Sequence, residues 1–218
     1  LLRHQDKTNN RMPTTVKEVL EKLSGGRVPG PLPTFNVLHV IKTLEILARE
    51  GIVGRFKLSQ ELEIGEGSVR TLLKRMKEAG LVQFSRSGCA LTGKGQDLWK
   101  EINSKIAAKA EINRTEVTVG SHNVAILIRD AGNRVTSGIE QRDAAIKAGA
   151  LGATTLVMRG GRLQIPAISE DVSRDFPEAY RQVMETLHPQ EGDAIVIGSA
   201  DEPRKAEYGA LAAAWTLL

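Results

Sequence analysis

The first regular pattern of apolar and polar positions along the chain is helical and begins at Thr15. Thr15 and Glu18 have the spacing of a capping box, and apolar residues follow at helical intervals as far as Leu23. The proline-rich run at 29–33 then favours extended backbone, because proline fixes its own φ and restricts the residue before it. We therefore expect residues 1–33 to form a polar arm with a short helix and a stiff, proline-rich connector.

A longer apolar stripe follows and predicts the first core helix. Its apolar residues recur at helical spacing after Thr34, the expected N-cap, and the pattern ends at Gly51. Residues 58–64 have room for a second helix, and the glycine-rich break at 65–67 precedes Ser68, which we expect to cap a third helix. This order of helix, tight turn and helix predicts a helix-turn-helix.

The third helix is amphipathic, and its outer face is basic. Its apolar residues from Val69 to Met76 share one face, and charged and small polar residues share the opposite face. The N-terminal and central positions of such a face suit contacts to base edges, whereas other basic positions suit phosphates. The predicted base contacts are Ser68, Arg70, Thr71 and Lys74. The predicted phosphate contacts are Arg75, Lys77 and Arg86.

Two short apolar runs after Gly80 predict a β-hairpin with Arg86 near its tip. The segment 58–91, with Gly-Glu-Gly-Ser-Val-Arg at 65–70 and Leu-Thr-x-x-Gly at 91–95, resembles the winged helix-turn-helix of prokaryotic transcription regulators of the MarR and PadR kind. The whole chain resembles a group of archaeal winged-helix proteins whose C-terminal half is a domain of unknown function. The resemblance implies a winged helix over 34–91, with the third helix in the major groove of DNA and the hairpin on the adjacent backbone.

The apolar stripe continues over 92–112 and predicts one long helix, longer than a compact winged helix needs. We therefore expect a linker and dimerisation helix over 92–116 and a homodimer. An equally open alternative is that Trp99 and Ile102 only pack back on the helix at 35–48.

After Glu116 the pattern alternates between strands and helices. Strands are predicted at 124–128, 154–158, 163–165 and 193–197, and helices at 138–150, at 172–187 and near the C-terminus. This βαββαβ order with a terminal helix predicts a ferredoxin-like α/β domain over 117–218. The expected fold class is α+β, with an N-terminal winged helix-turn-helix joined by a long helix to this domain.

One candidate ligand site lies in the second half. The loop at 198–201 is expected between a strand and a helix N-terminus, where backbone N–H groups can receive an anion, and the turn at 160–161 is flanked by arginines. The candidate effector-binding residues are Arg159, Arg162, Ser199 and Asp201. The simpler alternative makes Asp201 a helix N-cap and the glycine pair a tight turn.

No motif predicts catalysis. The four histidines are dispersed without two-ligand spacing, Ser199 is not in a nucleophile elbow, and there is no glycine-rich phosphate fingerprint. We therefore predict no catalytic residue, no metal site and no cofactor.

Composition and charge narrow the function classes. Residues 1–116 contain 20 Lys and Arg against 13 Asp and Glu, a net charge of +7, whereas residues 117–218 contain 10 against 13, a net charge of −3. A basic half favours a nucleic-acid partner, although excess lysine also serves solubility. Because only 4% of residues are aromatic, a stacking platform for single strands has few rings. The polar N-terminus, the lack of a long apolar run and the single cysteine predict a cytoplasmic protein with no membrane partner, disulfide or thiolate cluster.

These observations predict a sequence-specific transcriptional regulator that binds double-stranded DNA and whose C-terminal domain senses a small molecule or mediates assembly. One alternative is a small-metabolite enzyme with an accessory winged helix, against which the lack of a converging catalytic set counts. The other is a winged-helix protein-interaction module without DNA binding, against which the basic helix face counts.

Overall fold

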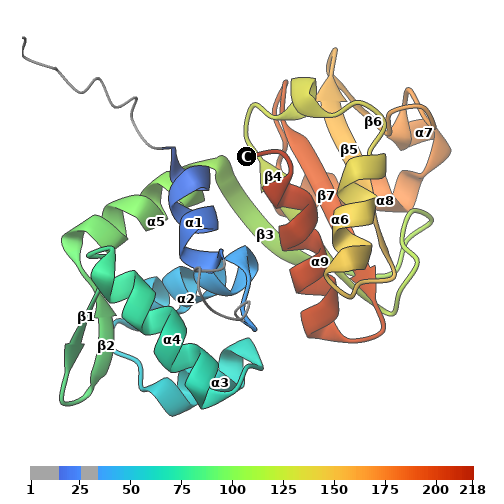
Figure 1. The fold of residues 1–218 in the computed structure, drawn as a ribbon. Helices are drawn as coiled ribbons and strands as arrows, with labels where there is room; N and C mark the ends of the chain where they lie inside the picture. Colours follow the sequence, from blue (N-terminus) through green and yellow to red (C-terminus); the bar gives the residue numbers. More distant parts are fainter. Residues whose placement is uncertain (1–14, 26–33) are drawn as a thin grey trace, which may run out of the picture. The chain divides into compact units, whose positions relative to one another are not determined.

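The computed structural model describes residues 15–25 and 34–218, which form helices and two antiparallel sheets (Figure 1). The chain divides into two compact units, Leu1–Leu98 and Trp99–Leu218. The predicted polar arm at 1–13 and the proline-rich connector at 29–33 lie outside the described residues. None of the described helices is long and apolar enough to cross a membrane.

The first unit opens with α1, Val16–Ser24, which begins at the predicted capping box. The Thr15 hydroxyl accepts a hydrogen bond from the Glu18 N–H (3.3 Å), and the Glu18 carboxylate accepts one from the Thr15 N–H (3.0 Å). Leu20 and Leu23 are the buried residues of this helix. The short N-terminal helix is therefore confirmed.

The core helix is α2, Val37–Glu50. Its N-cap is Asn36 rather than the predicted Thr34, because the Asn36 side chain accepts hydrogen bonds from two N–H groups of the first turn. Most of α2 is buried, including Leu44 and Leu47. A helix buried over most of its surface is a core element, as the apolar stripe predicted.

Two further helices follow: α3, Arg55–Leu62, and α4, Glu66–Glu78. Between them Glu63 adopts a left-handed conformation with φ 53°, which turns the chain sharply. The N-cap of α4 is Gly65 rather than the predicted Ser68, so the helix begins three residues earlier than predicted. The predicted order of helix, tight turn and helix is present.

The predicted hairpin is also present, as β1, Val82–Ser85, and β2, Gly88–Leu91. Val53 forms a bridge to its second strand, because the N–H and carbonyl groups of Val53 and Cys89 exchange two hydrogen bonds of 2.9 Å. Gly88 permits this approach, since a Cβ there would lie 2.6 Å from the Val53 carbonyl oxygen. The hairpin is thereby fixed to the helical part of its unit.

The Leu-Thr-x-x-Gly motif at 91–95 joins the hairpin to α5, Gly93–Lys105. The Thr92 hydroxyl donates to the Gly80 carbonyl (2.6 Å) and accepts from the Gly95 N–H (3.1 Å). A Cβ at Gly95 would lie 2.1 Å from the Leu81 carbonyl oxygen, so only glycine fits there. The motif therefore fixes the start of α5 against the end of α4.

The single long helix predicted over 92–112 is wrong beyond Lys105. From Ile106 to Ile112 the chain is strand β3, in which partly buried and exposed side chains alternate. Period two is the signature of a strand, and β4 supplies the hydrogen-bonding partner. The linker helix over 92–116 thus loses the excess length on which its dimerisation role was based.

The second unit contains a five-stranded antiparallel sheet in the order β3-β4-β7-β5-β6. Its remaining strands are β4, His122–Ile128; β5, Gly152–Arg159; β6, Arg162–Gln164; and β7, Ala194–Ala200. Its helices are η1, Gly132–Arg134; α6, Ile139–Lys147; α7, Val172–Asp175; α8, Pro177–Leu187; and α9, Pro203–Trp215. The predicted α+β class is confirmed.

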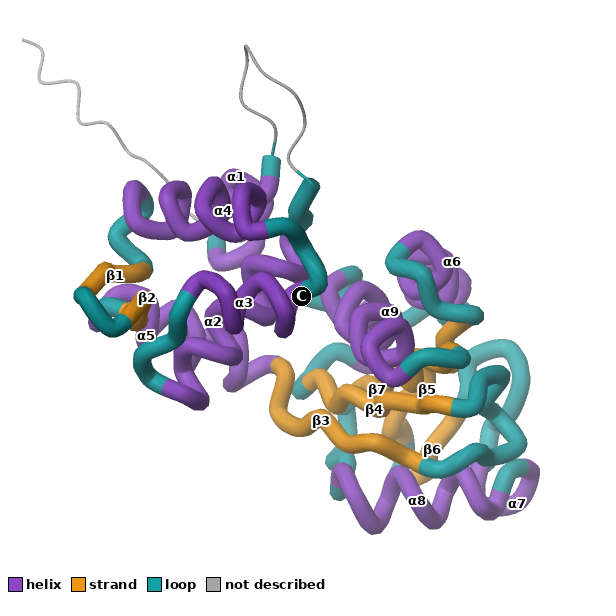
Figure 2. Tube along the Cα trace, turned by 90° about the horizontal axis from the view of Figure 1, so that it is seen from below, coloured by secondary structure: helices purple, strands orange, loops and turns teal. Residues whose placement is uncertain are grey.

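Helices cover both faces of this sheet, α6 and α9 on one and α7 and α8 on the other (Figure 2). On the first face α9 approaches β7 closely, since a Cβ at Gly198 would lie 2.4 Å from the Ala210 nitrogen. On the second face Leu127 and Ile195 share one core with Val183 of α8. The structure differs from the predicted ferredoxin-like βαββαβ arrangement, because β3 is an additional strand, β7 lies between β4 and β5, and the helices are not confined to one face.

Candidate nucleic-acid interface

A groove of about 610 Å³ lies between α4 and the β1–β2 hairpin. Its side chains are strongly basic, and none of the described residues that line it is acidic. The basic residues of the groove are Arg55, Arg70, Lys74, Lys77 and Arg86. We call this surface the basic groove. A concave surface with one sign of charge focuses its potential and attracts polyanions.

Helix α4 supplies three of these cations at spacings of four and three residues. Arg70, Lys74 and Lys77 therefore lie within one narrow strip along the helix, and all three are exposed. The opposite face of α4, including Leu72 and Met76, is fully buried in the core of the unit. The core thus fixes the rotation of α4 that turns the basic strip outward.

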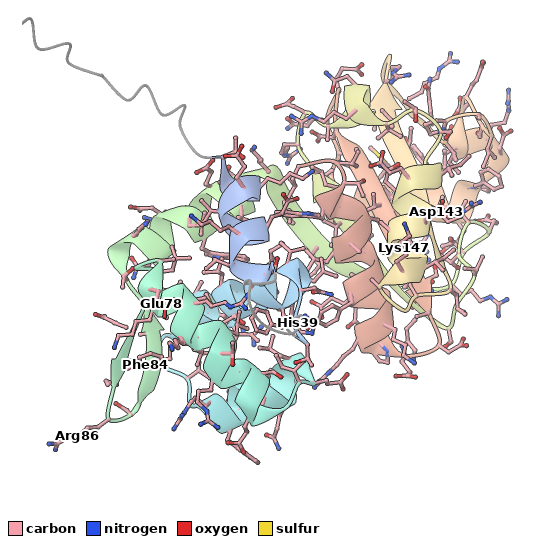
Figure 3. All side chains as sticks on the ribbon, in the orientation of Figure 1. His39, Glu78, Phe84, Arg86, Asp143 and Lys147 are labelled. Carbon is pink, nitrogen blue, oxygen red and sulfur yellow. The ribbon has the colours of Figure 1, made fainter. Side chains whose placement is uncertain are left out.

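The hairpin supplies the far wall of the groove. Its two-residue loop places Arg86 at the tip, where the side chain extends away from the ribbon (Figure 3). Phe84 is 45% exposed, and the Lys77 ammonium lies 5.4 Å from the centre of its ring. This cation–π contact connects α4 to the hairpin across the groove.

Arg75 does not lie on the exposed face, contrary to the prediction. Its side chain is buried, donates hydrogen bonds to the carbonyls of Leu23 (2.9 Å) and Gly25 (2.6 Å), and lies over the Phe35 ring. At 100° per residue Arg75 is turned 100° from Lys74, onto the flank of α4 where α1 packs. Arg75 therefore fixes the end of α1 rather than facing a ligand.

Ser68 lies on the same flank, seven residues before Arg75, and its hydroxyl contacts that of Thr34. It does not line the basic groove, so the structure does not join it to the other predicted base contacts. Thr71 is exposed next to the groove, and its hydroxyl donates to the Gly67 carbonyl (3.1 Å). Of the seven predicted DNA-contacting residues, the structure gathers Arg70, Lys74, Lys77 and Arg86.

Two groove residues were missed by the sequence reasoning. Arg55 begins α3 directly after the bridge that Val53 makes to the hairpin, and Phe84 is the third residue of β1. The bridge joins residues 36 positions apart, and no local pattern marks such a pairing. An exposed aromatic residue next to a basic tip was the one available signal for Phe84.

The single cysteine is not a reactive group of this surface. Cys89 borders the groove, but only 1% of its surface is exposed. This burial raises the pKa of its thiol to about 11. The thiol therefore stays protonated at neutral pH, and a protonated thiol is a poor nucleophile.

The predicted effector residues Arg159 and Arg162 face each other across the β5–β6 turn. Gly160 and Gly161 form this turn with positive φ, and their N–H groups donate to the two carboxylate oxygens of Glu191 (2.8 and 2.9 Å). These hydrogen bonds lower the pKa of Glu191. The anion site of the turn is thus occupied by the protein's own carboxylate.

Ser199 and Asp201 lie at the other end of the sheet. Ser199 is not in a loop as predicted but inside β7, where it is buried and donates to the Asn123 side chain (2.7 Å). Asp201 is exposed, and the N-cap of α9 is Glu202. Because β5 runs antiparallel to β7, Arg159 lies beyond the Ala194 end of β7, a full strand length from Ser199. The four predicted effector residues do not form one site.

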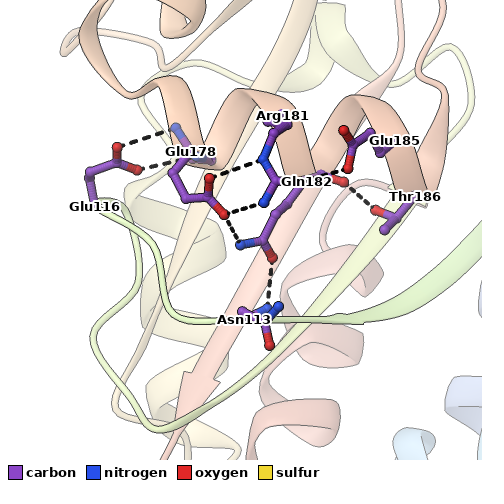
Figure 4. A network of polar contacts seen from close by, with 8 residues as sticks. Asn113, Glu116, Glu178, Arg181, Gln182, Glu185 and Thr186 are labelled. Atoms are coloured by element: carbon purple, nitrogen blue, oxygen red, sulfur yellow. Dashed lines mark hydrogen bonds and ion pairs between the residues drawn. The ribbon is translucent and has the colours of Figure 1, made fainter.

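A dense polar cluster of the second unit fixes the segment after β3 to α8 (Figure 4). The Glu116 carboxylate accepts hydrogen bonds from the first free N–H groups of α8, including that of Glu178 (3.3 Å). The Gln182 side chain accepts from the Asn113 N–H (2.7 Å), and hydrogen bonds from Arg181 lower the pKa of Glu178. These contacts cap and anchor a helix, so the cluster is structural.

Metal-ligating residues do not gather in the part of the chain that the structure describes. Over residues 15–25 and 34–218, no group of three or more His, Cys, Asp or Glu side chains is placed to hold an ion.

The two units match two sequence families. Residues 36–97 match the family described as PH0730-like, N-terminal domain, and residues 119–217 match the family described as a domain of unknown function, DUF4443. The first unit is therefore similar to the PH0730-like N-terminal domain, and the second unit is similar to DUF4443. The predicted C-terminal domain of unknown function is confirmed at this level.

Among solved structures, the chain is similar to the hypothetical protein PH0730 from Pyrococcus horikoshii OT3. The two chains share 28% sequence identity with a TM-score of 0.66, and the match covers 84% of this chain and 92% of that one. No curated protein matches the chain.

Proposed function

We propose that this protein is a sequence-specific transcriptional regulator that binds double-stranded DNA through its first unit. In this proposal α2, α3, α4 and the β1–β2 hairpin act as a winged helix-turn-helix. The observation that supports it is the basic groove, in which five cations and no described acidic side chain line the space between α4 and the hairpin.

The geometry of α4 suits the major groove of B-DNA, which is about 12 Å wide and admits one α-helix. Its basic strip runs along the exposed side of the helix, with Arg70 nearest the N-terminus. Arg70 is the candidate for a bidentate contact to guanine, because its guanidinium is planar and carries paired donors. Lys74 and Lys77 follow along the same strip and are suited to phosphates or to further bases.

Arg55 and Arg86 lie at the other walls of the basic groove. In the proposed complex both contact the DNA backbone on either side of the inserted helix, which fixes the orientation of the reader. Phe84, held by Lys77, gives the hairpin an apolar surface against the sugars. This division assigns sequence reading to α4 and positioning to the residues around it.

For the second unit, we propose that assembly fits better than effector binding. The four predicted effector residues lie at opposite ends of the sheet, and the glycine turn between the arginines is already occupied by Glu191. The net charge of −3 over residues 117–218 does not favour a second DNA contact.

The test is fluorescence anisotropy of the full chain with a labelled duplex of mixed sequence. Arg70→Ala and Lys74→Ala are expected to weaken binding by about tenfold each, because each removes a direct contact. Lys147→Ala, an exposed lysine of α6 in the acidic unit, is the matched control and is expected to leave the affinity unchanged. Equal DNA affinities for the wild type and both groove variants would contradict the assignment of the basic groove as the DNA-binding surface.

The same titration distinguishes one of the two other functions, and the placement of polar residues in the second unit argues against the other. A protein-interaction module would show no affinity for duplex DNA at low salt. A small-metabolite enzyme with an accessory winged helix would bind DNA but would need a converging catalytic set, and the candidates of the second unit, Ser199 and Asp201, lie apart from Arg159 and Arg162.

A further inference from the structure

Helix α6 carries an unusual outward stripe. Ile139 and Ile146 are 52% and 48% exposed, although isoleucine is among the residues most often buried in proteins. They are seven residues apart and therefore lie on the same side of the helix. The buried residues of α6, Gln141 and Ala145, lie on the opposite side. The stripe thus points directly away from the core of its own unit.

Two opposite charges flank this stripe at the same height along the helix. At 100° per residue, Arg142 and Asp143 lie about 50° to either side of the line through Ile139 and Ile146. Both side chains are about half exposed and form an ion pair of 3.0 Å with each other. Asp143 is visible on the outer side of α6 (Figure 3).

This arrangement is complementary to itself under one symmetry operation. A two-fold axis parallel to the helix places Ile139 against the partner's Ile139 and Ile146 against the partner's Ile146. It also exchanges the two flanks, so that Arg142 of each copy lies beside the partner's Asp143 on both sides of the contact. An antiparallel pair would instead place like charges together on each flank, so the charges select the parallel arrangement.

We propose that the protein forms a homodimer through α6, with the two helices parallel, the isoleucines in contact and two Arg142–Asp143 ion pairs between the copies. This surface takes over the role that the sequence assigned to the helix at 92–112. A dimer presents two basic grooves, which suits an operator with two half-sites.

Contact of one helix with its symmetry mate buries less than the roughly 1,200 Å² at which standard interfaces begin, so we expect association at about 10–500 µM protein. The dimer is also expected to weaken with salt, because its ion pairs are exposed at the rim.

The experiment is sedimentation velocity of the full chain over that concentration range, without DNA and at low salt. Ile146→Glu is expected to weaken the dimer by at least about thirtyfold, because it removes apolar contact and introduces a charge in both copies. Ile168→Glu is the matched control, since Ile168 is 71% exposed but lies between β6 and α7. The control is expected to dimerise like the wild type.

The charge pairs allow a sharper test. Arg142→Asp makes both flanks acidic and Asp143→Arg makes both flanks basic, so each variant alone is expected to dimerise at least about tenfold more weakly. A mixture of the two variants brings acidic flanks against basic flanks, so it is expected to form dimers over the same range of protein concentration as the wild type. The exchanged double variant, Arg142→Asp with Asp143→Arg, is expected to dimerise alone.

A wild-type chain that remains monomeric throughout the range would overturn the proposal, as would a dimer that Ile146→Glu leaves intact or a mixture of single charge variants that stays monomeric. Because the samples contain no DNA, each of these results leaves the basic groove untouched. A failure of the wild type to bind DNA would likewise not contradict the proposed dimer interface.

Discussion

Replacement of Arg75 by methionine separates the structural arginine of α4 from the DNA-contacting residues around it. Arg75 is 7% exposed and donates to two carbonyls at the end of α1, at 2.9 and 2.6 Å. Its guanidinium lies 5.2 Å from the centre of the Phe35 ring. Methionine retains the length and helix propensity of the side chain but has no donor, so both hydrogen bonds and the cation–π contact are lost.

The expected cost is about 2–4 kcal/mol. A hydrogen bond to a charged group contributes about 1.5–3 kcal/mol, and a partly buried cation–π contact contributes about 1 kcal/mol. Relief of the desolvation of the buried guanidinium and burial of the methionine offset part of this sum. Because Arg75 contacts the end of α1, the loss falls first on the docking of α1, and a cost of this size shifts that equilibrium by roughly 30- to 1,000-fold.

Hydrogen exchange of the full chain measures this shift directly. The amides of α1 from Val19 to Gly25, which are hydrogen-bonded in the helix, are expected to exchange faster in Arg75→Met by that factor. Lys74→Met changes the neighbouring exposed residue and is the control, with unchanged exchange in α1. In DNA titrations the other variant is the one affected: Lys74→Met is expected to weaken binding, whereas the affinity of Arg75→Met stays within about twofold of the wild-type affinity.

The reasoning would be refuted if Arg75→Met left the exchange of α1 unchanged. It would also be refuted if this variant lost as much DNA affinity as Lys74→Met while α1 remained protected.

Two further predictions concern stability. Gly95→Ala is expected to lower the free energy of unfolding by about 2–3 kcal/mol, because its Cβ would meet the Leu81 carbonyl. Gly93→Ala, which has open space around it, is expected to be neutral or stabilising. Urea denaturation of both variants measures the difference, and equal midpoints would contradict it. Burial lowers the pKa of His39, so below about pH 6.5 the unfolded chain binds a proton more readily than the folded one. The melting temperature of the wild type is therefore expected to fall further between pH 7.5 and 5.5 than that of His39→Gln, and parallel falls would disprove the contribution.

Local signals predicted the elements of the first unit well. The capping box at Thr15 and Glu18, the stripe of α2 and the two hairpin strands are each encoded within one short window, and each is present. The predicted basic strip on α4 depends only on helical geometry, so Arg70 and Lys74 lie where the sequence placed them. Short-range rules suffice where the neighbours in sequence are also the neighbours in space.

Arg75 shows where such rules end. A helical wheel separates the buried face from the rest but cannot tell which flank another segment will cover. The segment that covers Arg75 is the end of α1, where Leu23 is 52 residues away in sequence. For the same reason the flank position of Ser68 against Thr34 was not predictable from α4 alone.

The second unit shows the same limit at the level of topology. The run Ile106–Ile112 is rich in alanine, which favours helices, and its period of two was visible but short. Pairing with β4 decides in favour of a strand, because the sheet edge offers a complete row of hydrogen-bonding partners. Strand order likewise depends on long-range pairing, so the predicted strands were largely right and the predicted ferredoxin-like arrangement was not.

The most direct test of the central claim is the salt dependence of duplex DNA binding by the wild type and by Lys74→Ala/Lys77→Ala. The four proposed phosphate contacts, Arg55, Lys74, Lys77 and Arg86, correspond to a slope of log affinity against log salt of about −3.6. The wild-type affinity is therefore expected to fall by about a hundredfold between about 50 and 200 mM salt. The double variant is expected to bind more weakly, with a slope shallower by about 1.8, because two contacts are gone. If the wild type does not bind at the lower salt, or if both proteins bind with the same affinity and slope, the basic groove is not a DNA-binding surface.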